Sequence, residues 1–305
     1  MNETNTQRIA TWGGIGTNVN TNSIDEVLKL AKLDYTVDLQ PVFTKIGEKE
    51  VDIPSRRAVV RNDGHVYNTV SSSYVPIQNK EAFDFLHSID SDIRYVKGGE
   101  TAGGLIYIIG ELREMDILGD KFKLYAIFQN SHNARYQLAA TICPLRIVCQ
   151  NQFNISFKES ESTILIRHTK NIGNKVAVAA ETLRNINEYT KSFEEHAKKF
   201  AQQKITPDGV EKFLDFMFPE RPNMTQASIE RLELEKAKFM KAYNTDDNQN
   251  FQGTAWGLIN GLTDYITHST FTRKVENADE KKFVSTILDP KKLNNAITFI
   301  GSSMV

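Results

Sequence analysis

Alternating apolar and polar positions dominate the first half of the chain, whereas helical spacing dominates the second half. Tyr35, Val37 and Leu39 alternate with polar residues as far as Pro41, which is the period of a strand with one buried face. From about Asn174 onward, apolar residues recur at intervals of three and four positions, which is the period of an amphipathic helix. The pattern therefore predicts a sheet followed by helices.

Local signals divide the first 90 residues into shorter elements. A capping box at 23–26 opens a helix that we expect to end near residue 33. Two β-rich runs flank Asn62-Asp63-Gly64, a sequence that tolerates positive φ and predicts a hairpin. Asn79 can cap a helix over 80–90, whose apolar positions share one stripe.

A set of strands is predicted next, at 93–98, 105–113, 122–130, 140–153 and 162–168. Gly98-Gly99 and Leu118-Gly119-Asp120 supply turns between them. Prolines and polar runs near 206–208, 219–222 and 244–250 then separate the later helices. We expect an α+β fold: a largely antiparallel sheet with a few helices, followed by a helical C-terminal lobe. The expected divisions are a polar leader (1–22), an α+β sheet domain (23–172) and the helical lobe (173–305).

Composition narrows the class of protein without identifying a function. The 305 residues are 40% hydrophobic and 25% charged, with a net charge of −1, as in ordinary folded proteins. No run of apolar residues is long enough for a membrane span, and the polar first residues do not resemble a secretory signal. Two cysteines argue against a disulfide framework. We therefore expect no membrane partner and a cytoplasmic location.

Both cysteines lie in the segment CPLRIVCQNQF, residues 143–153. If residues 139–153 form one strand, Cys143, Cys149 and Phe153 share one face, and Arg146 and Gln150 share the other. Six residues of strand place the sulfur atoms roughly 20 Å apart, too far for a disulfide. The spacing of a metal site is also absent. We interpret both thiols as structural, and we predict no metal or cofactor.

Basic residues are concentrated in one window of this neutral chain. Residues 121–175 carry eight basic residues and two acidic ones, whereas most of the charged residues in 76–120 are acidic. Aromatic residues are interleaved with the basic ones, an arrangement that suits single-stranded nucleic acid. Amide-rich runs at 129–133 and 150–152 offer hydrogen-bond donors and acceptors that suit a polar ligand. The alternative is that the aromatics are core residues and that the basic strands face the acidic segment.

Signals for catalysis are weaker. Residues 98–104 are rich in glycine, but no Gly-Lys-Ser/Thr follows, so they predict a hairpin turn rather than a phosphate loop. No Gly-x-Ser-x-Gly motif is present. His168 is flanked by Arg167 and Lys170 at the end of a predicted strand, where a histidine is more often a hydrogen-bonded residue than a base.

Several segments resemble the phage/plasmid-like protein family, which is built on a prokaryotic domain of unknown function. They are YVPIQNKEAFDF (74–85), NSHNARYQ (130–137), CPLRIVCQNQF (143–153) and IRHTKN (166–171). One departure is NSHNAR, where the family pattern has aspartate after the histidine. The resemblance implies a protein of phages, plasmids or integrated elements, and it supplies no catalytic residue. The order of elements is also similar to that of phage single-strand annealing proteins, which is an analogy of fold alone.

Three hypotheses of function remain. The first is a mobile-element protein that binds single-stranded DNA and promotes annealing in replication or recombination. The second is a module that binds a host or defence protein through the helical lobe, and the third is a nucleic-acid hydrolase that uses His168. Further copies of the chain are an additional expected partner. For the first hypothesis we expect phosphate contacts from Arg135, Arg146, Lys158, Arg167 and Lys170. Gln150 and Asn151 are expected near the bases, Tyr136 or Phe153 as stacking residues, and His168 as a further nucleic-acid contact.

Overall fold

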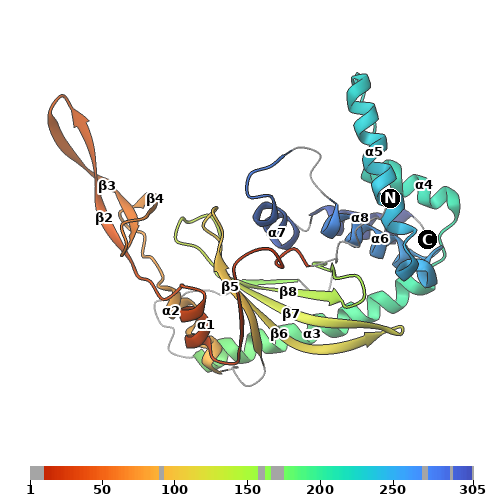
Figure 1. Ribbon diagram of the computed structural model, residues 1–305, viewed down its shortest axis with the longest axis horizontal. Coiled ribbons are helices and arrows are strands. Elements are labelled where there is room, and N and C mark those ends of the chain that lie inside the picture. The colour runs from red at the N-terminus through yellow and green to blue at the C-terminus, as the bar shows by residue number, and fades with distance from the viewer. Residues whose placement is uncertain are drawn as a thin grey trace, which may run out of the picture.

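The computed structural model describes residues 10–88, 93–156, 162–165, 175–269, 274–288 and 291–303. It has antiparallel sheets in the first half of the chain, with helices concentrated in the second half (Figure 1). The α+β prediction is therefore confirmed. The predicted boundary between the sheet domain and the helical lobe lies outside the described residues.

Within the described residues the main sheet has seven strands, and every neighbouring pair in it is antiparallel. Its order is β1-β5-β6-β7-β8-β10, and β9 pairs with β8. β1 comes from residues expected to belong to the leader. The strands are β1 (Thr17–Thr21), β5 (Arg94–Glu100), β6 (Ile106–Ile117), β7 (Asp120–Asn130), β8 (Ala139–Arg146), β9 (Asn151–Gln152) and β10 (Thr163–Leu165).

A second sheet of three strands forms an arm that projects from one end of the main sheet (Figure 1). It consists of β2 (Val37–Ile46), β3 (Lys49–Arg61) and β4 (Val66–Ser71), in that order. The predicted turn joins β3 to β4, and Gly64 has a φ of +92° there. That angle lies in the left-handed region, which glycine adopts without a steric penalty.

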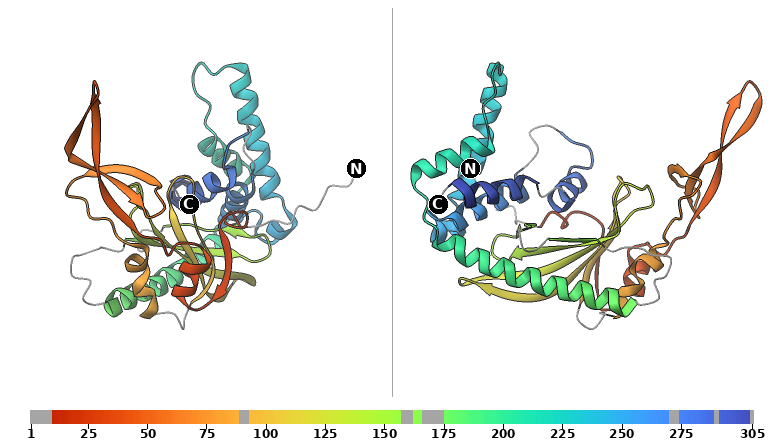
Figure 2. Two further views of the ribbon diagram at one scale, coloured as in Figure 1. Left: turned by 60° about the vertical axis from the view of Figure 1, so that its left-hand side comes forward. Right: turned by 180° about the vertical axis from the view of Figure 1, so that it is seen from behind.

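Short helices join the arm to the main sheet, and longer helices follow it. Ser23 caps α1 as predicted, since its side chain accepts a hydrogen bond from the Glu26 amide. The long helix α3 runs along the main sheet (Figure 2). None of the described helices has the length and apolar content that a membrane-spanning helix needs. The helices are α1 (Ile24–Leu30), α2 (Asn79–Phe83), η1 (Asp84–Ser88), α3 (Lys175–Gln202), α4 (Pro207–Met217), α5 (Gln226–Tyr243), η3 (Asp246–Phe251), α6 (Ala255–His268), α7 (Ala278–Leu288) and α8 (Lys291–Ser303).

One hydrophobic core joins the main sheet to the later helices. Phe153 lies 5.3 Å from Phe122 of β7, 5.9 Å from Phe193 of α3 and 5.5 Å from Trp256 of α6, measured between ring centroids. All four rings are almost completely buried, and burial of such rings dominates the energetics of a core. The opposite face of the sheet is covered by the segment around Trp12 and by Phe283 of α7.

The predicted strand over 140–153 is wrong. β8 ends at Arg146, residues 147–150 form a turn, and β9 folds back so that Leu145 lies opposite Gln152. Gln150 has a φ of +58° in this turn, a left-handed conformation that a strand does not contain. Cys143 and Phe153, which were expected on one face, consequently pack in different core clusters.

Two further local predictions require correction. Gly98 and Gly99 lie inside β5, and the turn between β5 and β6 is formed by residues 101–104. A Cβ atom at Gly98 would lie 2.9 Å from the Cβ atom of Ala31, so glycine is needed there for close packing rather than for a turn. The N-cap of α2 is Gln78 rather than Asn79.

Candidate functional site

A cleft of about 590 Å³ lies where the base of the arm meets one end of the main sheet. Its lining comes from five segments: residues 16–17, 31–33, 61 with 65–67, 99–104, and 133 with 135. We call it the glycine-turn cleft, because residues 99–104 include the turn between β5 and β6. Its volume is in the range of pockets that hold small ligands.

Several residues in or beside the glycine-turn cleft have a left-handed backbone conformation. Gly16 and Gly104 have φ values of +61° and +78°, and the non-glycine residues Lys32 and Ala134 have values of +56° and +59°. Left-handed conformations cost energy for residues with a Cβ atom, and they occur most often at ligand-binding and functional sites. The positions of Lys32 and of Arg135, which follows Ala134, are therefore set by strained backbone.

Glu100 is the hydrogen-bond acceptor at the centre of the cleft wall. Its Oε2 atom accepts hydrogen bonds from the hydroxyls of Tyr35 at 2.9 Å and Tyr67 at 3.1 Å, and from Arg61 Nη1 at 3.5 Å. The one hydroxyl proton of Tyr67 is shared with the Tyr35 oxygen, which lies 2.8 Å away. Arg61 also donates from Nε to Asp63 and lies over the Tyr35 ring. Burial raises the pKa of Tyr67 to about 12 and raises the pKa of Tyr35 further. Both tyrosines are therefore neutral donors at physiological pH.

His132 lies behind the tyrosines and is 1% exposed. Its Nε2 atom is 3.1 Å from Oδ1 of Asn79, and the Asn79 amide group donates to the Leu33 carbonyl. Since that amide orientation makes Oδ1 an acceptor, Nε2 carries the proton and Nδ1 is an acceptor. Nδ1 has no partner among the described residues. Burial lowers the pKa of His132 to about 4, so the ring is neutral at physiological pH.

Lys32 and Arg135 supply unpaired positive charge at the cleft. Both side chains are exposed, and neither has an ion pair or side-chain hydrogen bond within the described part of the chain. The described lining contains three basic side chains, Lys32, Arg61 and Arg135, and one acidic side chain, Glu100. Arg61 is bound by Asp63 and lies 3.5 Å from Glu100. The cleft therefore has an excess of positive charge, which attracts anions.

Of the residues predicted from sequence to contact nucleic acid, Arg135 lies at this cleft. Tyr136 follows it in the chain and is half-buried. Its backbone N–H and C=O groups bond to the hydroxyl of Ser131, which anchors the loop between β7 and β8. These two residues thus occupy a constrained loop rather than a free one.

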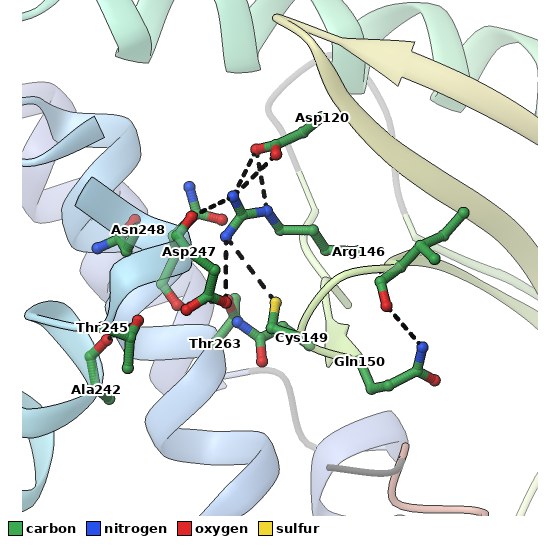
Figure 3. Close-up of polar contacts among 12 residues, drawn as sticks. Asp120, Arg146, Cys149, Gln150, Ala242, Thr245, Asp247, Asn248 and Thr263 are labelled. Carbon is green, nitrogen blue, oxygen red and sulfur yellow. Dashed lines mark hydrogen bonds and ion pairs between the residues drawn. The ribbon is translucent and has the colours of Figure 1, made fainter. Parts of the chain in front are cut away.

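Arg146 lies in the interior instead, as Figure 3 shows. It is 2% exposed, and it donates from Nε and Nη2 to the two carboxylate oxygens of Asp120 at 2.9 Å each. It also donates to the Asp247 carbonyl at 2.6 Å, which joins β8 to η3. Contact with a phosphate, as expected from the sequence, would require an exposed guanidinium. The guanidinium of Arg146 is instead surrounded by protein groups.

The other predicted contacts are also not gathered at the cleft. The Gln150 side chain donates to the Ile147 carbonyl within its own turn, and Asn151 Oδ1 lies 3.0 Å from His268 Nε2. Phe153 is completely buried, so it is a core residue rather than a stacking surface. Lys158, Arg167, His168 and Lys170 lie outside the described residues.

Sequence reasoning missed Lys32, Arg61, Tyr67 and Glu100, because these residues come from three separate segments of the chain. The glycine-rich run at 98–104 was the one local signal that pointed to this place. Among the residues that the structure describes, no group of three or more histidine, cysteine or acidic side chains is arranged to hold a metal ion.

Comparisons with known proteins give a family without an activity. Residues 66–286 match a family described as a domain of unknown function (DUF932). No curated protein and no solved structure matches the chain. The match begins at β4 and includes most of the glycine-turn cleft, but Lys32, Tyr35 and Arg61 precede it.

Proposed function

This chain belongs to the DUF932 family, and because that description assigns no activity, we propose from the geometry that the protein binds single-stranded nucleic acid in the glycine-turn cleft. The observation that carries the proposal is the pair of unpaired, exposed cations, Lys32 and Arg135, at a cleft whose described lining contains one acidic side chain. Cations in this setting bind phosphate groups and release counterions.

The cleft also offers aromatic rings beside these cations. Tyr67 is half-buried and His65 is exposed, and both line the cleft with their ring centroids 4.7 Å apart. Bases of a single strand stack on such rings, whereas a duplex keeps its bases inside. The combination of cations with accessible rings therefore favours a single strand over a duplex.

The biological setting is part of the same proposal. A protein of a phage, plasmid or integrated element would meet single strands in the cytoplasm of a prokaryotic cell during replication or recombination. Binding of a strand along the cleft, with its bases partly accessible, would allow a complementary strand to anneal. No catalytic residue is required for this activity.

The test is fluorescence anisotropy of labelled single-stranded and duplex DNA over a series of salt concentrations. The variants are Lys32→Ala and Arg135→Ala. Their matched controls are Lys199→Ala on α3 and Arg113→Ala on β6, which are exposed residues outside the cleft lining. Each control removes the same charge, so it isolates the effect of position.

We expect each cleft variant to weaken binding by about tenfold, as for a hydrogen bond to a charged group. Each should also reduce the slope of log affinity against log salt by about 0.7, the value for one phosphate contact on a single strand. The controls should bind like the wild type. Equal losses in the cleft variants and controls would refute the cleft as the binding site, and no binding at low salt would refute the function.

A second candidate function is protein binding, favoured by exposed apolar residues near the tip of the arm. Phe43 and Ile46 of β2 are 54% and 66% exposed. They lie where the arm consists of β2 and β3 only, beyond the residues of β3 that pair with β4. Exposed strand edges with apolar side chains are sites of pairing with another chain. Sedimentation of the wild type and of a Phe43→Ser, Ile46→Ser double variant tests self-association through the arm. A monomeric wild type would refute this contact between copies.

A further inference from the structure

The two carboxylate oxygens of Glu100 differ in their hydrogen bonding. Oε2 accepts hydrogen bonds from Tyr35 and Arg61, and it shares the hydroxyl proton of Tyr67 with the Tyr35 oxygen. Oε1 has no partner within the described part of the chain. The residue lines the cleft and its side chain is 17% exposed, so Oε1 is an unused acceptor at the wall of the binding site.

The position of Oε1 is fixed before any ligand arrives. Three donors converge on the other oxygen, and the Arg61 guanidinium is itself held by Asp63 and by the face of Tyr35. A group held in this way loses little conformational entropy on binding, which increases both affinity and specificity. Oε1 is therefore suited to selecting a ligand group that donates a hydrogen bond.

The bases of a single strand differ in the donors that they present. Cytosine carries an exocyclic amino group, and carboxylates in proteins accept hydrogen bonds from that group. Thymine has a carbonyl oxygen where cytosine has its amino group, and its one ring donor, N3–H, lies between two carbonyl oxygens that repel an approaching carboxylate. Lys32, Arg135 and Glu100 line the same cleft, so the cations are placed to bind the phosphate of a nucleotide whose base contacts Glu100.

We propose that Oε1 of Glu100 accepts a hydrogen bond from the exocyclic amino group of a base such as cytosine, so that the protein prefers cytosine-containing strands over thymine strands. This inference rests on the proposed function, since it assigns base selectivity to the same cleft. It adds a base-reading residue, Glu100, to the phosphate-binding residues Lys32 and Arg135.

The test compares oligo(dC), oligo(dT) and an oligomer in which 2-pyrimidinone, a cytosine without its amino group, replaces cytosine. All have equal length, on the order of ten nucleotides. We expect the wild type to bind oligo(dC) about tenfold more tightly than either of the others, the value of one hydrogen bond to a charged group. The pyrimidinone oligomer tests the contact without any change in the protein.

Glu100→Gln is the matching change in the protein. The three donors require an oxygen at the Oε2 position, so the amide nitrogen takes the place of Oε1 and presents a donor to the cleft. The preference for oligo(dC) should disappear. The control is Glu48→Gln at the turn between β2 and β3, which removes the same charge from an exposed position outside the cleft lining and should leave the preference intact.

The possible results separate this inference from the proposed function. Equal binding of oligo(dC), oligo(dT) and the pyrimidinone oligomer overturns the inference and leaves single-strand binding in place. No binding of any oligomer overturns the proposed function. A further comparison uses oligo(U). If oligo(U) binds more tightly than oligo(dT) while oligo(dC) and oligo(dT) bind equally, Oε1 contacts the ribose hydroxyl, and the proposed contact with the base is overturned. A full cytosine preference in Glu100→Gln also overturns it.

Discussion

Arg146 and Asp120 form a buried, two-point ion pair in which Nε and Nη2 of the guanidinium donate to the two carboxylate oxygens at 2.9 Å each. Asp120 begins β7, and Arg146 ends β8. The same guanidinium donates to the Asp247 carbonyl of η3. Arg146 consequently links the start of β7 and the end of β8 to η3 in the helical half of the protein (Figure 3).

Arg146→Ala should lower the free energy of unfolding by about 3–5 kcal/mol, because it leaves two aspartates without their buried partner. Arg135→Ala is the matched control, since that arginine is exposed and unpaired in the described structure, and it should change stability by less than about 0.5 kcal/mol. Urea unfolding followed by circular dichroism measures both. Similar small losses in the two variants would contradict the structural role of Arg146.

Gly257 of α6 should not tolerate alanine. A Cβ atom there would lie 2.1 Å from the Phe251 carbonyl oxygen, so η3 would have to move away from α6. We expect Gly257→Ala to lower the free energy of unfolding by about 3 kcal/mol. Gly301→Ala on α8 has nothing within 4 Å and should be neutral or stabilising by up to about 1 kcal/mol. Equal thermal midpoints for the two variants would be inconsistent with the packing of η3 on α6.

The two cysteines should be unreactive while the protein is folded. Both are buried, and burial raises the pKa of Cys143 and of Cys149 to about 12. At pH 8 almost no thiolate forms, and the thiolate is the reactive species. Titration with a disulfide reagent such as DTNB should detect no thiol in the native protein and two after denaturation. Rapid labelling of the native protein at the rate of a free thiol would contradict the burial of these residues.

Stability should fall in mild acid because of His132. Its pKa is 6.5 when unperturbed and about 4 in the folded protein, so the unfolded chain binds more protons between these two values. The stability from this group is complete above pH 6.5 and is lost as the pH falls toward 4. Between pH 7 and pH 5 the loss should be about 2 kcal/mol.

The control for this effect is His132→Gln, which keeps a donor for Asn79 but does not titrate. Urea unfolding of both proteins at pH 7 and pH 5 isolates the contribution of the histidine. The variant should lose about 2 kcal/mol less than the wild type over this interval. Parallel pH dependence in the two proteins would mean that His132 is not held neutral by burial.

Elements with strong local signals were predictable from sequence. Ser23 caps α1, and the turn at Asn62-Asp63-Gly64 joins two strands, because short-range hydrogen bonds and positive φ determine these features. The end of β8 was not predictable in this way. The alternating pattern continues past Arg146, and the chain turns there in the setting of tertiary contacts with Asp120 and η3.

The candidate site was largely hidden from sequence reasoning for a related reason. A charge window treats Arg135 and Arg146 alike, but the fold exposes the first and buries the second between two aspartates. Lys32 and Glu100 are far from that window in the chain, and only the fold brings them to the same cleft. Charge counts along a sequence contain no information on which residues will be paired inside the core.

The most direct test of the account is photo-crosslinking of a single strand that carries 5-iododeoxycytidine, followed by mass spectrometry of the crosslinked peptides. The iodinated base reacts with aromatic rings that it stacks on, so it reports the position of the strand. The account predicts crosslinks to Tyr67 or His65, and their loss in a Lys32→Ala, Arg135→Ala double variant. Crosslinks confined to residues outside the glycine-turn cleft, unchanged in the double variant, would contradict it.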